Sequence, residues 1–254
     1  KTAYVIYQCD WSSDVCSSDL AGATKSEIKP IEVEDLLGRP QRVLDRSGLE
    51  RMIAGKRVMV TGAGGSIGSE LVRQIAAFNP AHLALLDNGE YQLYLIDSAM
   101  AESWPSLPRS AILGDVRDRV RVDQVLARER PDLVFHAAAF KHVPLVEANP
   151  NEGVLTNVAG TRVVADAAIA AGVQAMVLIS TDKAVNPSSL MGASKRVAEI
   201  YCQALEVASR GRGDTRFVTV RFGNVLGSTG SVVPLFQRQD RKSTRLNSSH
   251  TDIS

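Results

Sequence analysis

The chain has little cysteine, no long hydrophobic run and almost no net charge, and each absence excludes a class of protein. Of its three cysteines, two lie in the first 20 residues and only Cys202 lies further along. A single thiol can form neither a disulfide framework nor a zinc site, so we expect a reducing compartment and no metal. No run of about 18 apolar residues is present, so no segment is predicted to span a membrane. The formal net charge of +1 argues against nucleic acid as the main partner.

The two ends of the chain have a composition of their own. Residues 1–20 and 240–254 are polar and rich in serine. They resemble in-frame translations of short-read sequencing adapters, with a disordered tail at each end as the alternative, and we assign them no function. Between them we expect a lead-in over residues 21–54 and one domain over residues 55–239. A span of about 220 residues is long enough for a single α/β domain with a substantial core.

From residue 57 onward, short apolar runs alternate with amphipathic stretches. The apolar runs are typical of buried parallel strands, and they cover residues 58–60, 83–86, 111–113, 133–135, 176–179 and 217–220. The amphipathic stretches predict helices over residues 47–54, 66–78, 91–101, 119–128, 152–171 and 192–208. Strands that alternate with helices in this way predict an α/β fold with a doubly wound parallel sheet and right-handed crossovers.

A glycine-rich loop follows the first predicted strand and opens the next predicted helix. Gly62, Gly65 and Gly68 can adopt positive φ and allow the backbone to approach a pyrophosphate, which then lies at the positive end of the helix. A plain tight turn is the alternative. The strand before the loop and the helix after it favour a dinucleotide site, to which Ser66 and Ile67 at the start of the helix are also assigned.

An acidic residue, Asp87, ends the second predicted strand. At this place a carboxylate can accept both hydroxyls of an adenosine ribose, although it could also cap the next helix. The carboxylate would repel a 2′-phosphate, and no arginine follows it in Asn88-Gly89-Glu90. The sequence therefore favours NAD over NADP as the cofactor.

Five longer motifs follow one another along the chain. They are TGAGGSIG (61–68), HAAAFKHVPL (136–145), TNVAGT (156–161), STDKAVNP (180–187) and RFGNVLGS (221–228). Together they resemble the extended short-chain dehydrogenase/reductases that act on nucleotide sugars. More narrowly, they resemble the UDP-N-acetylglucosamine 4,6-dehydratases of capsular polysaccharide biosynthesis. The resemblance covers residues 31–239.

The resemblance also has implications for the whole protein. It implies an NAD(P)-binding Rossmann fold, a UDP-sugar as substrate and a homo-oligomer. It implies a substrate subdomain of which most would follow residue 239. It further implies a longer parent protein anchored in the bacterial inner membrane, with this domain on the cytoplasmic face.

A 4,6-dehydratase oxidises C4 of the hexose, removes the acidified C5 proton, expels water from C6 and returns the hydride to C6. The resemblance implies that Asp182 is the acid at C6 and Lys183 the base at C5. Both follow the fifth predicted strand, and ligands gather at the carboxyl ends of parallel strands. Lys183 would need a lowered pKa to act as a base near neutral pH. A strand-end salt bridge between two solvated charges is the alternative.

The tyrosine of the family's Tyr-x-x-x-Lys pair is absent. Met191 stands in its place, four residues before Lys195, so the two side chains share one helix face. Lys195 can still hold the nicotinamide ribose, but a methionine cannot move a proton. Relatives that resemble this chain also carry methionine there, which implies that Thr181 or a water molecule relays the C4 hydroxyl proton.

The remaining site assignments also rest on the resemblance. Cofactor contacts are assigned to Asp115, Val116, Ala137 and Ala138, and substrate contacts to Lys141, His142, Asn157, Arg221 and Asn224. Asn157 is also expected to orient the backbone around the active-site lysine. Several of these residues have plain structural alternatives, which are a helix cap for Asp115 and Asn157, a structural histidine for His142 and a turn for Asn224.

Three functions remain open at this point. The first is a UDP-N-acetylglucosamine 4,6-dehydratase, and the second is a UDP-hexose 4-epimerase that uses the same hydride step without eliminating water. The Asp182-Lys183 pair favours the dehydratase, because an epimerase needs no acid and base at C5 and C6. The third is a Rossmann subunit that binds cofactor without catalysis, and Met191 is its sole support.

Overall fold

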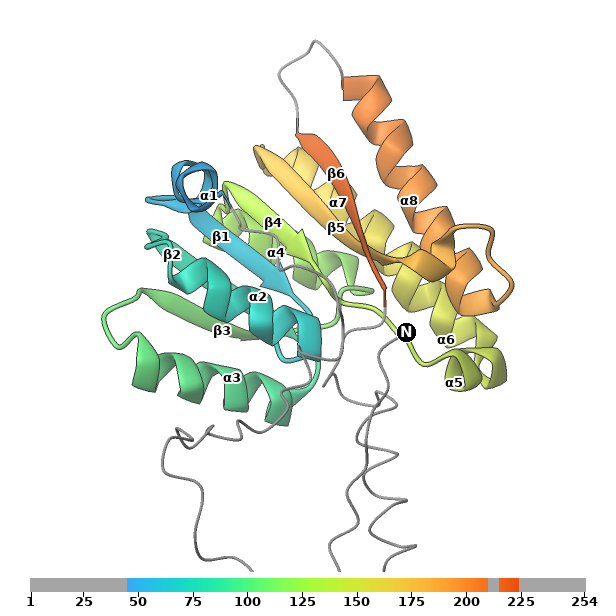
Figure 1. Ribbon diagram of the computed structural model, residues 1–254, viewed down its shortest axis with the longest axis horizontal. Helices are drawn as coiled ribbons and strands as arrows, with labels where there is room; N and C mark the ends of the chain where they lie inside the picture. Colours follow the sequence, from blue (N-terminus) through green and yellow to red (C-terminus); the bar gives the residue numbers. More distant parts are fainter. Residues whose placement is uncertain (1–44, 210–214, 224–254) are drawn as a thin grey trace, which may run out of the picture. The chain divides into compact units, whose positions relative to one another are not determined.

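The computed structural model describes residues 45–209 and 215–223. Their centre is a six-stranded sheet in the order β3-β2-β1-β4-β5-β6, in which every pair of neighbours is parallel (Figure 1). The strands are β1 (Arg57–Thr61), β2 (His82–Asp87), β3 (Arg109–Leu113), β4 (Leu133–His136), β5 (Ala175–Thr181) and β6 (Arg216–Phe222). The strand order reverses between β1 and β4, as in a doubly wound Rossmann fold. The predicted fold class is confirmed.

Helices connect consecutive strands, as the amphipathic stretches predict. They are α1 (Arg46–Ile53), α2 (Ser66–Ala76), α3 (Glu90–Ser103), α4 (Arg119–Glu129), α5 (Val143–Ala148), α6 (Pro150–Val154), the π-helical turn η2 (Leu155–Gly160), α7 (Thr161–Ala170), the 3₁₀ turn η3 (Asp182–Ala184) and α8 (Leu190–Ser209). The stretch predicted as one helix over residues 152–171 is divided into α6, η2 and α7. The short helix α5 was not predicted, because six residues are too few to show a helical period.

The sheet is buried on both faces, and alternate residues of each strand enter different cores. Val58 and Val60 of β1 pack with α1, α2 and α3, whereas Met59 between them packs with α4, α7 and α8. Side chains alternate in this way because successive residues of a strand point to opposite faces. Burying a valine or methionine side chain stabilises the fold by roughly 1.5–3 kcal/mol. The two cores therefore hold the carboxyl ends of the strands in fixed register.

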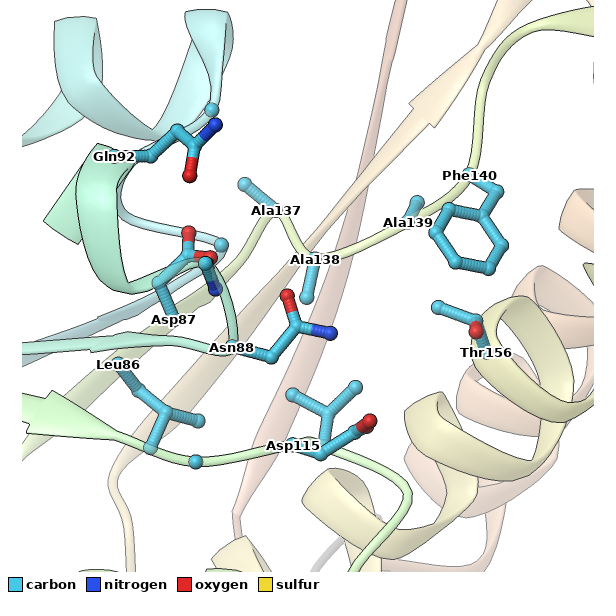
Figure 2. A pocket seen from close by; sticks show the side chains of 15 residues that line it. Leu86, Asp87, Asn88, Gln92, Asp115, Ala137, Ala138, Ala139, Phe140 and Thr156 are labelled. Carbon is cyan, nitrogen blue, oxygen red and sulfur yellow. Dashed lines mark hydrogen bonds between the residues drawn. The ribbon is translucent and has the colours of Figure 1, made fainter. Parts of the chain in front are cut away.

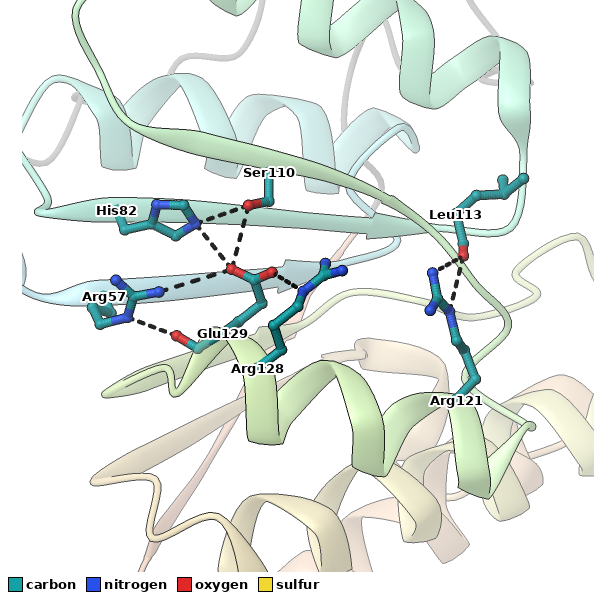
Figure 3. A network of polar contacts seen from close by, with 7 residues as sticks. All are labelled: Arg57, His82, Ser110, Leu113, Arg121, Arg128 and Glu129. Carbon is teal, nitrogen blue, oxygen red and sulfur yellow. Dashed lines mark hydrogen bonds and ion pairs between the residues drawn. The ribbon is translucent and has the colours of Figure 1, made fainter.

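A buried carboxylate links the amino-terminal ends of three strands (Figure 3). The Glu129 side chain at the end of α4 is only 6% exposed, and its Oε2 lies 3.0 Å from His82 Nε2 on β2. The same oxygen accepts from Ser110 Oγ on β3 at 3.3 Å, and Oε1 accepts from Arg128 Nε at 2.8 Å. Arg57 of β1 donates through Nε to the Glu129 carbonyl oxygen at 2.6 Å. This network lies at the end of the sheet opposite the carboxyl ends of the strands.

We expect Glu129→Ala to lower the free energy of unfolding by about 3 kcal/mol, because it leaves several buried polar partners unpaired. Denaturant unfolding followed by circular dichroism measures the change. Glu70→Ala is the matched control, since the Glu70 side chain is 57% exposed and forms a surface pair with Arg73. The control should change the free energy by less than about 0.5 kcal/mol. Equal losses in both variants would contradict the role of this network.

The described residues contain neither a membrane-spanning helix nor a metal-binding cluster. No helix within residues 45–209 and 215–223 is long and apolar enough to cross a bilayer. In the same part of the chain, no group of histidine, cysteine, aspartate and glutamate side chains is arranged to hold a metal ion. Residues 1–44 and 224–254, which include both ends interpreted as adapter sequence, lie outside the described residues.

Candidate active site

The carboxyl ends of β1 to β4 open on a pocket of ≈ 340 Å³. Figure 2 shows Asp87 and Asn88 on one side of this pocket and Phe140 and Thr156 on the other. The pocket lies beside the point where the strand order reverses, which is where ligands of doubly wound sheets bind. It is lined by Gly62, Gly65, Leu86, Asp87, Asn88, Gly89, Gln92, Gly114, Asp115, Val116, Ala137, Ala138, Ala139, Phe140 and Thr156.

The glycine loop forms one wall of the pocket, and its geometry requires glycine at two positions. Gly62 has a φ of +68°, and a Cβ there would lie 2.6 Å from the backbone nitrogen of Ala138. A Cβ on Gly68 would overlap the carbonyl oxygen of Gly62, so α2 packs directly on the loop. Gly65 lines the pocket and is the N-cap of α2, which directs the positive end of this helix toward a bound phosphate. Ser66 and Ile67 begin α2 without lining the pocket.

Asp87 lines the pocket with its carboxylate held by two backbone amides. Its Oδ2 accepts from Gly64 N and its Oδ1 from Gly89 N, both at 2.8 Å. The N-cap of α3 is Gly89, so Asp87 is not the cap that the sequence left open as an alternative. The carboxylate is oriented at the end of β2, where a ribose would present its hydroxyls.

Asp115 and Val116 line the same pocket from the loop after β3. Arg117 donates from Nη2 to Asp115 Oδ2 at 2.7 Å and from Nη1 to Glu152 Oε2 at 2.6 Å. Burial raises the pKa of the Asp115 carboxyl, and the hydrogen bonds and charge of Arg117 lower it by more, so its pKa lies below the usual value. The N-cap of α4 is Asp118, which excludes the helix-cap alternative for Asp115.

Thr156 places a hydroxyl without a partner at the pocket wall. The residue is only 7% exposed, and its Oγ1 has no hydrogen-bond partner within the described part of the chain. Leaving a buried hydroxyl unpaired costs about 1–3 kcal/mol, and a polar ligand atom in the pocket would remove this cost. Together with the glycine wall, the oriented Asp87 carboxylate and the apolar surface of Ala137 and Ala138, this orphaned hydroxyl fits a bound dinucleotide.

A chain of buried hydrogen bonds, which the sequence analysis did not predict, connects the glycine loop to η2. Thr161 Oγ1 donates to the Asn157 carbonyl oxygen at 2.7 Å, so it must accept from His136 Nε2 at 3.0 Å. His136 Nδ1 then accepts from Thr61 Oγ1 at 2.6 Å. Burial and the charge of Lys195 lower the pKa of His136 to about 3, so the ring stays neutral. The residue before Gly62 is thereby tied to β4 and to the start of α7.

Asn157 uses its side chain to hold the backbone. Its Oδ1 accepts from Phe140 N at 2.8 Å, and its Nδ2 donates to Phe140 O and to Ser194 Oγ, both at 3.0 Å. The side chain is fully buried. These contacts join the loop after β4 to α8 near Lys195, which agrees with the expected backbone-orienting role. Its assignment as a substrate contact stays a prediction.

Lys195 is buried on α8 beneath the end of β5. Its Nζ donates to the Ile179 carbonyl oxygen at 2.9 Å. Burial lowers the pKa of Lys195 to about 8, while the charge of Glu199 acts in the opposite direction. Met191, one turn earlier, is 2% exposed and packs in the interior. The position that the family's tyrosine would occupy therefore carries no acid or base.

Asp182 and Lys183 form η3 immediately after β5. Lys183 Nζ lies 3.2 Å from Asp182 Oδ1, which also accepts from Thr181 Oγ1 at 3.0 Å. The hydrogen bond of Lys183, followed by that of Thr181, holds the pKa of Asp182 below its usual value. The two side chains are 57% and 40% exposed. This is the strand-end ion pair that the sequence left open as an alternative, and it lies at the carboxyl end of β5.

The other predicted substrate residues lie apart from the pocket lining. Lys141 and His142 are exposed between β4 and α5, next to the pocket residue Phe140. Arg221 on β6 donates from Nε and Nη2 to the Glu199 carboxylate, at 2.8 and 2.6 Å. Asn224 lies outside the described residues. The roles of these residues in substrate binding stay predictions.

Comparison with known proteins identifies the family. Residues 58–254 match the family described as "Polysaccharide biosynthesis protein". The chain belongs to this family. The match includes each strand of the sheet, and it confirms the resemblance to capsular polysaccharide enzymes inferred from the five motifs.

Individual relatives include both kinds of nucleotide-sugar enzyme. The chain is 45% identical to the capsular polysaccharide biosynthesis protein CapD of Staphylococcus aureus, over 89% of this chain and 37% of CapD. It is 37% identical to an inverting UDP-N-acetylglucosamine 4,6-dehydratase of Campylobacter jejuni, over 74% of the chain and 54% of the relative. It is 36% identical to the UDP-glucose 4-epimerase of Rickettsia typhi, over 77% and 56%. The chain therefore spans about a third to a half of the length of these relatives.

Solved structures share the fold. The X-ray structure of Pen from Bacillus thuringiensis superposes with a TM-score of 0.68 at 36% identity, covering 74% of this chain and 58% of Pen. A dTDP-glucose 4,6-dehydratase, the DesIV double mutant from Streptomyces venezuelae, superposes with a TM-score of 0.61 at 27% identity, covering 74% and 62%. The latter structure contains bound NAD.

The sequence analysis assigned no role to three residues around the site, which are His136, Thr156 and Glu199. The first two stand in the recognised motifs HAAAFKHVPL and TNVAGT, but their burial and partners depend on contacts between distant segments. Glu199 follows Lys195 by four residues, and this spacing was an available signal that the two groups share a helix face.

Proposed function

We propose that the protein is a nucleotide-sugar 4,6-dehydratase that acts on UDP-N-acetylglucosamine through a 4-keto intermediate, for surface polysaccharide biosynthesis. The observation that supports this most is the Asp182–Lys183 pair, 3.2 Å apart at the end of β5. An elimination across C5 and C6 needs one base and one acid at those carbons, and an epimerisation at C4 needs no acid or base there. The proposed substrate is therefore a UDP-sugar. We also propose that the whole protein is a homo-oligomer and is anchored at the cytoplasmic face of the inner membrane.

The cofactor is NAD(P), with NAD favoured, and when bound it would supply the hydride acceptor for C4 and the hydride donor for C6. The chain's own residues supply the binding site. Gly62 and Gly65 let the pyrophosphate approach the N-terminus of α2, and Asp87 accepts the ribose hydroxyls. We assign Lys195, whose Nζ donates to the Ile179 carbonyl oxygen, to the nicotinamide ribose.

Asp182 and Lys183 can reach the required protonation states by one proton shift. As an ion pair, the carboxylate cannot donate and the ammonium cannot accept. Transfer of one proton from Lys183 Nζ to Asp182 Oδ1, across 3.2 Å, yields a neutral amine and a protonated acid together. The amine then removes the C5 proton, and the acid protonates the departing C6 hydroxyl. Exclusion of water by bound substrate favours the neutral pair, because it raises the cost of separated charge.

The C4 hydroxyl proton needs a different route, because Met191 cannot accept it. Thr181 is the nearest hydroxyl to the pair, with its Oγ1 donating to Asp182 Oδ1 at 3.0 Å. It relays the C4 proton to solvent, directly or through a water molecule, because Asp182 already holds the proton received from Lys183. The pair regains one proton from solvent at the end of the cycle, after Asp182 has given its proton to the C6 hydroxyl and Lys183 has returned its proton to C5.

A UDP-hexose 4-epimerase is the second candidate, because one relative at 36% identity carries that name. Mass spectrometry of UDP-N-acetylglucosamine incubated with the protein separates the candidates. A product lighter by one water supports the dehydratase, and an isomer of unchanged mass supports the epimerase. Cofactor binding without any sugar product would support a non-catalytic Rossmann subunit. The experiment uses the extended protein, by which we mean this chain continued after residue 239 to the length of its relatives.

We expect the protein to bind NAD⁺ at least about tenfold more tightly than NADP⁺, because the ionised Asp87 carboxylate repels a 2′-phosphate. Isothermal titration with both cofactors measures the preference. Asp87→Asn keeps the size of the side chain and removes its charge, so it should reduce the preference. Glu102→Gln, at an exposed position near the end of α3, is the control for a lost surface charge. Tighter binding of NADP⁺ by the unmodified protein would refute the assignment of Asp87.

A further inference from the structure

Glu199 is a fully buried carboxylate to which the proposed reaction assigns no role. Its side chain is 0% exposed, and both oxygens are occupied. Oε1 accepts from Ser180 Oγ at 2.6 Å and from Arg221 Nε at 2.8 Å. Oε2 accepts from Arg221 Nη2 at 2.6 Å and from Arg196 Nη1 at 3.0 Å. Burial raises the pKa of Glu199, but the hydrogen bonds of Arg221, Ser180 and Arg196 outweigh burial and lower it to about 2.

Glu199 and Lys195 hold two consecutive residues of β5 from one face of α8. They lie four residues apart, so their side chains are neighbours on the helix. Lys195 binds the carbonyl oxygen of Ile179, and Glu199 binds the hydroxyl of Ser180. The next residue of the strand is Thr181, followed by the Asp182–Lys183 pair. The position of the reacting pair therefore depends on how α8 holds the last residues of β5.

Stability alone does not explain a charge at this position. A buried ion pair is often no more stabilising than apolar side chains of similar size. The chain contains a second example in Glu129, which is equally enclosed by basic and polar partners at the opposite end of the sheet. Both carboxylates join a helix to strands, but only Glu199 borders the proposed catalytic residues. The two positions can therefore be compared directly.

We propose that Glu199 is a positioning residue for the dehydration reaction, which holds Ser180 so that Asp182 and Lys183 meet the sugar and keeps Lys195 charged. The inference rests on the proposed function. The positioning part acts through the hydrogen bond to Ser180. The electrostatic part acts through the negative charge one helical turn from Lys195.

The electrostatic part follows from the groups that surround Lys195. Glu199 and Cys202 face it from α8, the Ile179 carbonyl from β5 and His136 from β4. Burial raises the pKa of the Cys202 thiol to about 12, and His136 is neutral as described above. Among these groups, Glu199 is therefore the one that carries a negative charge. Arg221 and Arg196 donate to the Glu199 carboxylate. Neutralising Glu199 lowers the pKa of Lys195 further below about 8, so the lysine loses its charge at a lower pH.

The test compares Glu199→Gln with Glu129→Gln in the extended protein with NAD bound. Glu199→Gln should reduce kcat for water loss at least about tenfold, with KM for the sugar within about threefold. The alkaline limb of its rate profile should move down by about one pH unit. Hydrogen exchange of the amides in residues 180–184 should become faster. Glu129→Gln should lower the melting temperature and leave kcat, the alkaline limb and exchange at residues 180–184 unchanged.

Ser180→Ala separates the two parts and serves if Glu199→Gln does not fold. It removes one hydrogen bond and leaves the carboxylate charge, so kcat and the exchange rates should change without a shift of the alkaline limb. A Glu199→Gln variant that is merely less stable, with the kcat, pH profile and exchange of the wild type, would overturn the inference. So would an unchanged kcat and unchanged exchange in Ser180→Ala.

The outcome also separates this inference from the proposed function. Absence of water loss in the wild-type extended protein would refute the dehydratase, whatever Glu199 does. The exchange rates of residues 180–184 do not depend on turnover. In that case faster exchange in Glu199→Gln, with no change in Glu129→Gln, would still support the role of Glu199 in holding β5. Equal exchange rates in both variants would overturn that role.

Discussion

Replacement of Asp182 by asparagine or of Lys183 by alanine is expected to lower the rate of water loss by about 10²–10⁴-fold, because each change removes a proton-transfer group. Cofactor affinity should stay within a few fold, since neither residue lines the dinucleotide pocket. Both variants are measured in the extended protein, with mass spectrometry for water loss and isothermal titration for NAD⁺.

The two variants should fail at different steps. In heavy water, the C5 proton of the 4-keto sugar exchanges with solvent only if a base removes it. Lys183→Ala should therefore block deuterium incorporation at C5. Asp182→Asn should permit slower incorporation, with solvent in place of Asp182 as the acceptor of the Lys183 proton, while water loss from C6 stays blocked. This difference distinguishes the assigned roles from a general loss of the ion pair.

A second exposed ion pair provides the matched control. Arg119 on α4 pairs with Asp123 at 2.8 Å, with side chains 51% and 44% exposed. Arg119→Ala and Asp123→Asn break a surface pair of similar exposure that does not line the pocket. They should leave turnover unchanged, because such pairs contribute about 0–1 kcal/mol to stability. Turnover near that of the wild type in Asp182→Asn or Lys183→Ala would refute the acid and base assignment.

Residues 21–239 expressed alone are expected to bind NAD⁺ in part and to show no dehydratase turnover, while the extended protein is active. Catalysis needs the sugar held over the nicotinamide, and a misplacement of about 1 Å can lower the rate about 10²-fold. The Asp182 and Lys183 side chains are 57% and 40% exposed to water in the described structure. Phe222, at the carboxyl end of β6, is also 37% exposed. A reaction that moves a proton and expels water from the sugar needs this end of the sheet to be shielded from bulk solvent.

The comparison requires both proteins at equal concentration, with saturating NAD⁺ and UDP-N-acetylglucosamine. The short form should retain part of the cofactor affinity, because Gly62, Gly65 and Asp87 line a pocket formed within residues 45–209. A titration of NAD⁺ therefore serves as the control for folding. Comparable turnover by the short form would show that residues 21–239 complete the substrate site, and the expectation would be wrong.

The sequence by itself determined the fold class and the place of the dinucleotide pocket. Strand and helix periods are local properties, as are the glycine spacing and the acidic residue at the end of a strand. The structure agrees on six strands, on Gly62 and Gly65 at the pocket and on Asp87 at its wall. The prediction of one helix over residues 152–171 missed the division into α6, η2 and α7, because a π-helical turn is defined by its backbone hydrogen bonds between residues i and i+5, which the side-chain pattern does not reveal.

Only the tertiary structure decided which side chains are buried together around the reacting pair. Glu199 meets Ser180 and Arg221 across 19 and 22 residues, and His136 meets Thr61 across 75. No periodic pattern encodes such contacts, because they depend on the order of strands in the sheet and on how α8 lies against β5 and β6. Burial in turn sets the pKa values of His136, Lys195 and Glu199, since the free energy of a charge depends on the solvent and partners that surround it.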